Sequence, residues 1–145
     1  MTQQQQGPPT EVEPATRPED VDTAFWLWLV ALPLLVAGYV VDLVTMPVAG
    51  PAGYVYAVSG VFVVVVASVV LAFLFLMRQG YRWARTVLTG GAAATVVYAV
   101  TNVFGVERPT VAAVSYAVTA IIGSVAILGG VYLLHRKDAH AFFTR

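Results

Sequence analysis

Long apolar stretches separated by charged residues dominate the chain. There are four of them, at residues 23–41, 43–77, 86–106 and 109–135, with His135 counted as neutral. About 20 apolar residues in a helix, each rising about 1.5 Å, cross a hydrocarbon core of roughly 30 Å. The pattern predicts membrane-spanning helices near residues 23–44, 55–77, 84–104 and 110–134. Although Val61–Val66 resembles a buried strand, the length of its uncharged surroundings favours a helix.

Glycine and proline lie between the predicted helices, where the chain must turn. They include Gly50 and Pro51 in the first connection, Gly80 in the second, and Gly105 and Pro109 in the third. Short connections make consecutive helices antiparallel neighbours. We therefore predict an all-α, polytopic membrane protein with four transmembrane helices in an up-down-up-down antiparallel bundle.

The composition agrees with a membrane environment. Of the 145 residues, 59% are hydrophobic and 11% are charged, whereas a soluble domain has about 25% charged residues. The chain contains no cysteine, which excludes disulfides, thiolate metal sites and thiol redox chemistry. It has no basic stripe for nucleic acid, so we expect no nucleic-acid partner.

The two ends of the chain differ from the apolar part. Residues 1–22 contain four consecutive glutamines, paired prolines and five acidic residues, and predict a disordered cytoplasmic tail. This acidic start is unlike the positive region of a secretory signal, so we expect the first helix to be retained. Residues 135–145 predict a short basic cytoplasmic tail.

Lys and Arg residues set the expected orientation, because cytoplasmic segments of membrane proteins carry an excess of them. A cytoplasmic N-terminus leaves only Arg108 on the outer side. The residues then on the inner side are Arg17, Arg78, Arg82, Arg85, Arg136, Lys137 and Arg145. We therefore predict a multi-pass protein of the cell membrane with both termini in the cytoplasm.

Asp42 is the only acidic residue inside or against an apolar stretch, and such a carboxylate is a candidate functional group. It lies about 28 Å along the helix from Thr23, near the outer interface. We expect it to be hydrated there or paired with Arg108, rather than to be a proton or substrate site. Asn102 lies at a similar depth, so Asp42, Asn102 and Arg108 form a possible polar site, with Thr101 and Glu107 nearby. Packing across helices is the simpler role for Asn102.

The fourth predicted helix carries small residues along one face. These are Ser115, Thr119, Gly123, Ala126 and Gly130. Small residues let helix backbones approach closely in lipid, where the hydrophobic effect does not drive helices together. We favour packing inside the bundle over a homo-oligomer or partner helix.

The second connection combines arginines with aromatic residues. Arg78, Arg82, Trp83 and Arg85 can bind anionic lipid headgroups or simply determine topology, and the same charges serve either role. Pro33 lies inside the first helix and is expected to kink it.

Sequence motifs for catalysis are missing. The two histidines, His135 and His140, fall at or beyond the inner end of the fourth helix, which argues against haem ligation. No nucleophile triad, phosphate-binding loop, dinucleotide turn or metal-ligand cluster is present. We therefore expect no enzyme activity, cofactor or metal.

Two segments resemble a known group of proteins. Residues 21–29, with the sequence VDTAFWLWL, and residues 78–89, with the sequence RQGYRWARTVLT, are similar to segments of small four-helix membrane proteins of actinobacteria. That resemblance implies the same layout and supplies no catalytic residues. Small multidrug transporters are similar in size only, since they have a glutamate deep in helix one, where this chain has Leu32, Pro33 and Leu34.

These observations favour a non-enzymatic interaction or accessory subunit, in contact with the lipid bilayer and with a membrane protein partner or further copies of itself. The alternative is a small homo-oligomeric transporter or lipid-handling protein that uses Asp42 and Asn102.

Overall fold

The computed structural model describes residues 16–144, which form five helices and no strand. The helices are α1 (Glu19–Thr45), α2 (Ala52–Arg78), α3 (Arg82–Gly105), α4 (Thr110–Leu134) and the short α5 (Lys137–His140). Each of the first four is long and apolar enough to cross a membrane. The all-α fold and the helical bundle are thus confirmed, and the four apolar helices indicate a multi-pass membrane protein.

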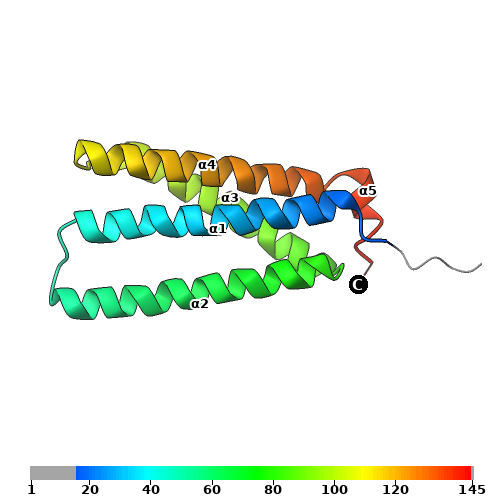
Figure 1. The fold of residues 1–145 in the computed structure, drawn as a ribbon, viewed down its shortest axis with the longest axis horizontal. Coiled ribbons are helices and arrows are strands. Elements are labelled where there is room, and N and C mark those ends of the chain that lie inside the picture. Colours follow the sequence, from blue (N-terminus) through cyan, green and yellow to red (C-terminus); the bar gives the residue numbers. More distant parts are fainter. Residues whose placement is uncertain (1–15, 145) are drawn as a thin grey trace, which may run out of the picture.

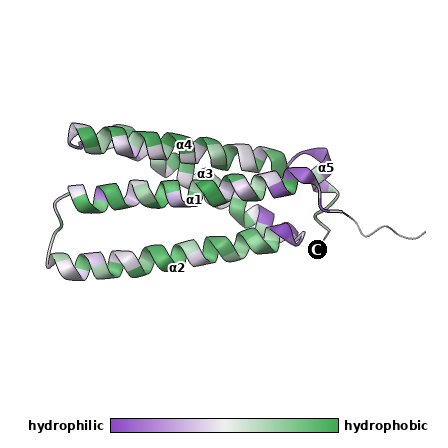
Figure 2. Cartoon of the chain, viewed as in Figure 1, coloured by the Kyte–Doolittle hydropathy of each residue, from purple (hydrophilic) through white to green (hydrophobic). Residues whose placement is uncertain are grey.

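The four long helices form a ring in which each contacts its two neighbours (Figure 1). The most extensive contact joins α1 to α4, while the diagonal pairs, α1 with α3 and α2 with α4, do not approach each other among the described residues. Polar residues gather where α1 begins and α4 ends (Figure 2). We call this the basic end, and the opposite one the Asp42 end.

Small residues explain the close contact between α1 and α4. A side chain at Gly38 of α1 would lie 2.9 Å from Oγ1 of Thr119, and one at Gly123 would lie 3.1 Å from Leu35. At Gly130, an added Cβ would overlap the indole of Trp28. Because glycine occupies these three positions, the two helices can pack closely along their whole length.

The well-packed core lies at the basic end. The largest fully buried side chains are Val21, Leu74, Met77, Leu134 and Phe143, and all five belong to one hydrophobic cluster there. Leu74 and Met77 are the only buried residues of α2 and occupy its last turns. Helix α2 is therefore held at one end, and its remaining length is loosely packed against the bundle.

Helix α1 begins earlier than the sequence pattern predicts. We expected residues 1–22 to be a disordered tail, but α1 starts at Glu19. Val21 is fully buried, Asp20 pairs with Arg136 at 3.0 Å and Asp22 pairs with Arg78 at 3.0 Å. Tertiary contacts thus stabilise a turn that has too few apolar residues to be recognised locally. The remainder of the expected tail, residues 1–15, lies outside the described residues.

The C-terminal segment folds against the basic end instead of extending away as a simple tail. Phe143 is 2% exposed, and the Arg85 guanidinium lies over its ring, 4.8 Å from the centroid. Gly80 has φ 89°, and an added Cβ there would lie 3.1 Å from the carbonyl oxygen of Phe142. Aromatic residues at the end of the chain, which the charge pattern does not highlight, therefore close the bundle at this end.

Candidate functional site

An apolar cavity of about 460 Å³ lies among the four long helices. Its wall runs from Trp28 to Asp42 along α1 and includes Phe62 and Val66 of α2 and Ala94 of α3. The cavity exists because the diagonal helices stay apart and α2 is packed tightly only at its last turns. Phe62 and Val66 remain exposed although they line it, so the cavity is not sealed beside α2.

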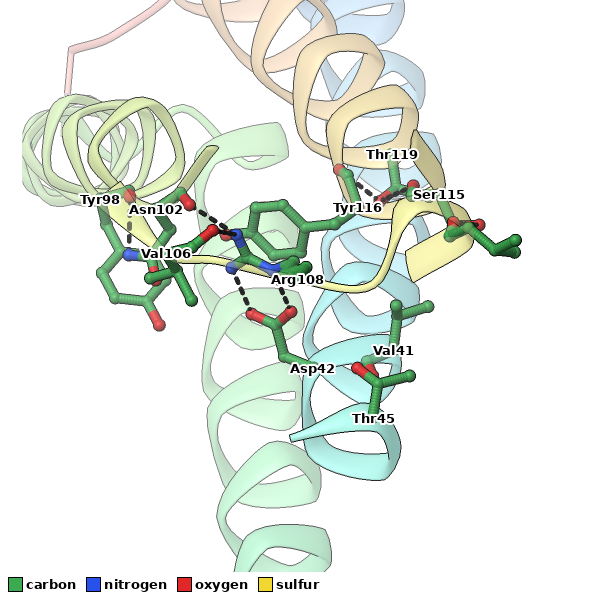
Figure 3. A network of polar contacts seen from close by, with 11 residues as sticks. Val41, Asp42, Thr45, Tyr98, Asn102, Val106, Arg108, Ser115, Tyr116 and Thr119 are labelled. Atoms are coloured by element: carbon green, nitrogen blue, oxygen red, sulfur yellow. Dashed lines mark hydrogen bonds and ion pairs between the residues drawn. The ribbon is translucent and has the colours of Figure 1, made fainter. Parts of the chain in front are cut away.

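An ion pair between Asp42 of the cavity wall and Arg108 joins α1 to the connection that precedes α4 (Figure 3). Arg108 donates from Nε to Oδ1 of Asp42 at 2.6 Å and from Nη2 to Oδ2 at 2.8 Å. This fork-to-fork geometry is the strongest arrangement of a guanidinium and a carboxylate. It connects the last turns of α1 to the start of α4 at the Asp42 end.

Backbone and aromatic groups complete the surroundings of Arg108. Its Nη1 donates to the carbonyl oxygens of Asn102 at 2.6 Å and Val106 at 3.3 Å, and its guanidinium lies 3.9 Å from the ring centroid of Tyr116. The hydrogen bonds to Asp42 raise the pKa of Arg108 above its ordinary value, despite the opposing effect of burial. The guanidinium therefore stays charged, and four of its N–H groups are engaged.

The possible polar site of the sequence analysis is brought together only in part. Asp42 and Arg108 meet, but Asn102 contributes its carbonyl oxygen, while its side-chain amide donates to the carbonyl of Tyr98 at 2.9 Å. The hydroxyl of Thr101 donates to the carbonyl of Val97 within its own helix. Glu107 is exposed. The side chain of Asn102 thus satisfies its own helix and does not face the ion pair.

The two partners of the ion pair differ in what they present to the cavity. The side chain of Arg108 is 2% exposed and that of Asp42 is 20% exposed, and only Asp42 is part of the cavity wall. A carboxylate has about four lone-pair directions, of which Arg108 occupies two. The member of this ion pair that faces the cavity is therefore a hydrogen-bond acceptor, and Tyr39, Tyr98 and Tyr116 also belong to the wall.

Trp28 lies in the cavity wall at the end opposite Asp42. It is 6% exposed, and its indole N–H has no hydrogen-bond partner among the described residues. The same edge of the ring packs on Gly130. The fluorescence of Trp28 should therefore report on occupancy of the cavity.

The small-residue face of α4 is directed largely at α1. Gly123 and Gly130 are buried and lie against Leu35 and Trp28. Thr119 lies against Gly38, while Ser115 donates to the carbonyl of its own helix at Val111. Ala126 packs partly buried against the core cluster.

The residues of the arginine-rich connection have separate partners at the basic end. Arg78 pairs with Asp22, and Arg85 donates to the carbonyl of Leu134 at 3.4 Å. Arg82 is exposed, and Trp83 is 50% exposed, with its ring edge-on to Phe73. Arg82 and Trp83 are thus the members of this group that face the surroundings.

Sequence reasoning missed several residues of the cavity, including Trp28, Tyr98 and Tyr116. The face of α1 that packs inside the bundle does have a sequence signal. Its small residues Ala24, Ala31 and Gly38 recur every seven residues, and all three are buried. No comparable signal marks the cavity itself, because apolar wall residues and lipid-facing residues have the same composition.

Among residues 16–144, no three His, Asp or Glu side chains gather in a way that could hold a metal ion. Comparison of the chain with protein-family models, with curated proteins and with solved structures finds no match.

Proposed function

We propose that the protein is a non-enzymatic integral membrane protein that binds the apolar chain of an amphiphilic molecule from the bilayer. The observation that carries this proposal is the cavity of about 460 Å³ between the four helices. Its volume falls in the range of about 300–1,000 Å³ found for small-molecule sites. A lipid-handling role was the alternative raised by the sequence, and the cavity now favours it.

The dimensions of the cavity support an extended chain as its occupant. Trp28 and Asp42 are fourteen residue steps apart on α1, about 21 Å at 1.5 Å per residue. A single leaflet contributes about 15 Å of hydrocarbon. The wall is mostly apolar over this length, so contact with a hydrocarbon chain costs little desolvation of polar groups.

The interaction or accessory role stays a prediction. The exposed apolar residues of α2, such as Val61 and Val64, are equally suited to contact with lipid tails or with a partner helix.

Quenching of Trp28 fluorescence tests the proposed function. The chain has three tryptophans, so the double variant Trp26→Phe, Trp83→Phe retains Trp28 alone. We expect a dibrominated lipid chain added to this protein in detergent micelles to quench Trp28 saturably. In this background Ala94→Phe fills the cavity and should weaken the apparent affinity roughly tenfold, a change of about 1.4 kcal/mol.

Ala93→Phe is the matched control for Ala94→Phe. Ala93 is the exposed neighbour of Ala94 on α3 and is not part of the cavity wall, so the same enlargement should leave the affinity unchanged. Non-saturable quenching, or equal behaviour of the two variants, would exclude the cavity as a binding site.

We further propose that the basic end faces the cytoplasm, in the cell membrane. The basic end holds Arg17, Arg78, Arg82, Arg85 and Arg136, whereas Arg108 lies at the Asp42 end. Excess Lys and Arg are retained on the cytoplasmic side.

Cysteine labelling in intact cells tests this orientation. Because the chain has no cysteine, single substitutions give a clean background. We expect a membrane-impermeant maleimide to label Gly53→Cys at the Asp42 end and to label Thr144→Cys only after the cells are lysed. The reverse pattern would overturn the orientation, and labelling of both in intact cells would show mixed insertion.

A further inference from the structure

The polar end of the cavity constrains the head group of the molecule bound there. Asp42 is the charged residue in the cavity wall, and its side chain is 20% exposed. The side chain of Arg108 is 2% exposed and lies behind the carboxylate, with two N–H groups on Asp42 and two on backbone carbonyls. A head group that reaches this end therefore meets the acceptor oxygens of Asp42 before it meets the guanidinium of Arg108.

The type of head group follows from this acceptor. A phosphate or carboxylate would bring a second negative charge against the exposed oxygens of Asp42, and Arg108 is already paired with the first. A head group without an O–H or N–H would leave the free lone pairs of Asp42 desolvated and unpartnered. A donor is thus required.

The charge of the head group is limited by Arg108. The fork-to-fork pair already neutralises Asp42, so an ammonium group would add an uncompensated positive charge beside the guanidinium. A hydroxyl donates one hydrogen bond and carries no net charge. A neutral amide also meets both conditions, but a hydroxyl is the smallest head group that does.

We infer that the cavity selects a long-chain alcohol, with its hydrocarbon chain running toward Trp28 and its hydroxyl donating to the carboxylate of Asp42. This inference rests on the proposed binding of an apolar chain in the same cavity. It adds the chemical class of the ligand, a neutral amphiphile that ends in a hydroxyl, and a role for Asp42 as the acceptor that recognises it.

A ligand series tests the inference on the protein that retains Trp28 alone. Dibrominated stearyl alcohol, its methyl ether and dibrominated stearic acid share one chain and differ at the head. At alkaline pH, where the acid is ionised, quenching of Trp28 should show the alcohol binding roughly tenfold more tightly than either of the others, as expected for one hydrogen bond to a charged group.

The outcomes separate this inference from the proposed function. Saturable quenching with equal affinity for the alcohol and the ether would overturn the recognition by Asp42 and leave chain binding intact. Tightest binding of the acid would also overturn it, in favour of an anion site. A lack of saturable quenching by all three ligands would overturn the proposed function as well.

A variant of the polar end gives an independent test. In Asp42→Leu, Arg108→Met, apolar residues replace the whole ion pair, which avoids leaving one charge alone. We expect this variant to bind the alcohol and the ether equally, at the affinity of the ether. A preserved preference for the alcohol would overturn the role of Asp42. If the variant does not fold, the ligand series on the parent protein still decides.

Discussion

Arg108→Met is expected to lower the free energy of unfolding by about 3–5 kcal/mol, the usual cost of removing one partner from a buried ion pair. The variant leaves Asp42 without its two charge-assisted hydrogen bonds and removes the donors to the carbonyls of Asn102 and Val106. It also removes the cation from the face of Tyr116. Unfolding by a denaturing detergent, followed by circular dichroism in micelles, measures the effect.

Two further variants distinguish the ion pair from a general effect of the loop. Glu107→Gln changes the exposed neighbour of Arg108 and should alter stability by no more than about 0.5 kcal/mol. Asp42→Leu, Arg108→Met should recover most of the loss, since apolar residues in place of a buried pair are often close to neutral. A small effect of Arg108→Met, or a double variant as unstable as the single one, would contradict the assigned role of the pair.

The four helices and their antiparallel order are predictable from the sequence because lipid imposes a simple rule on it. A chain in the bilayer must satisfy its own backbone groups, so each long apolar stretch becomes a helix. The prediction of residues 110–134 coincides with α4, and the other three helices are each somewhat longer than expected. The additional turn at the start of α1 depends on partners distant in sequence, Arg78 and Arg136.

The ion pair was accessible to sequence reasoning, whereas the cavity was not. Asp42 and Arg108 share a membrane depth and have opposite charges, so their pairing could be raised as a possibility. The cavity depends on how far α2 stands from its neighbours, and Leu74 and Met77 are the residues of α2 that are buried against them. A local pattern of hydrophobic residues does not encode that distance, because lipid tails and protein side chains are equally apolar.

Gly130→Ala is expected to destabilise the protein by about 1–3 kcal/mol, as overpacking does in a well-packed site. The added Cβ would overlap the indole of Trp28 and lie 3.4 Å from the carbonyl oxygen of Ala24. The rigid ring is 6% exposed and also contributes to the cavity wall, so relief requires α1 and α4 to separate. Unfolding in denaturing detergent measures the loss, and Trp28 fluorescence should shift as its surroundings change.

Gly129→Ala is the matched control, because the neighbouring glycine of the same helix has room for a methyl group. An added Cβ there would lie 3.5 Å from Cδ1 of Leu27, an ordinary contact, and alanine has a higher helix propensity than glycine by up to about 1 kcal/mol. Stability should therefore stay level or rise. If Gly130→Ala were as stable as Gly129→Ala, the close approach of α4 to Trp28 would be wrong, and with it the position of Trp28 in the cavity wall.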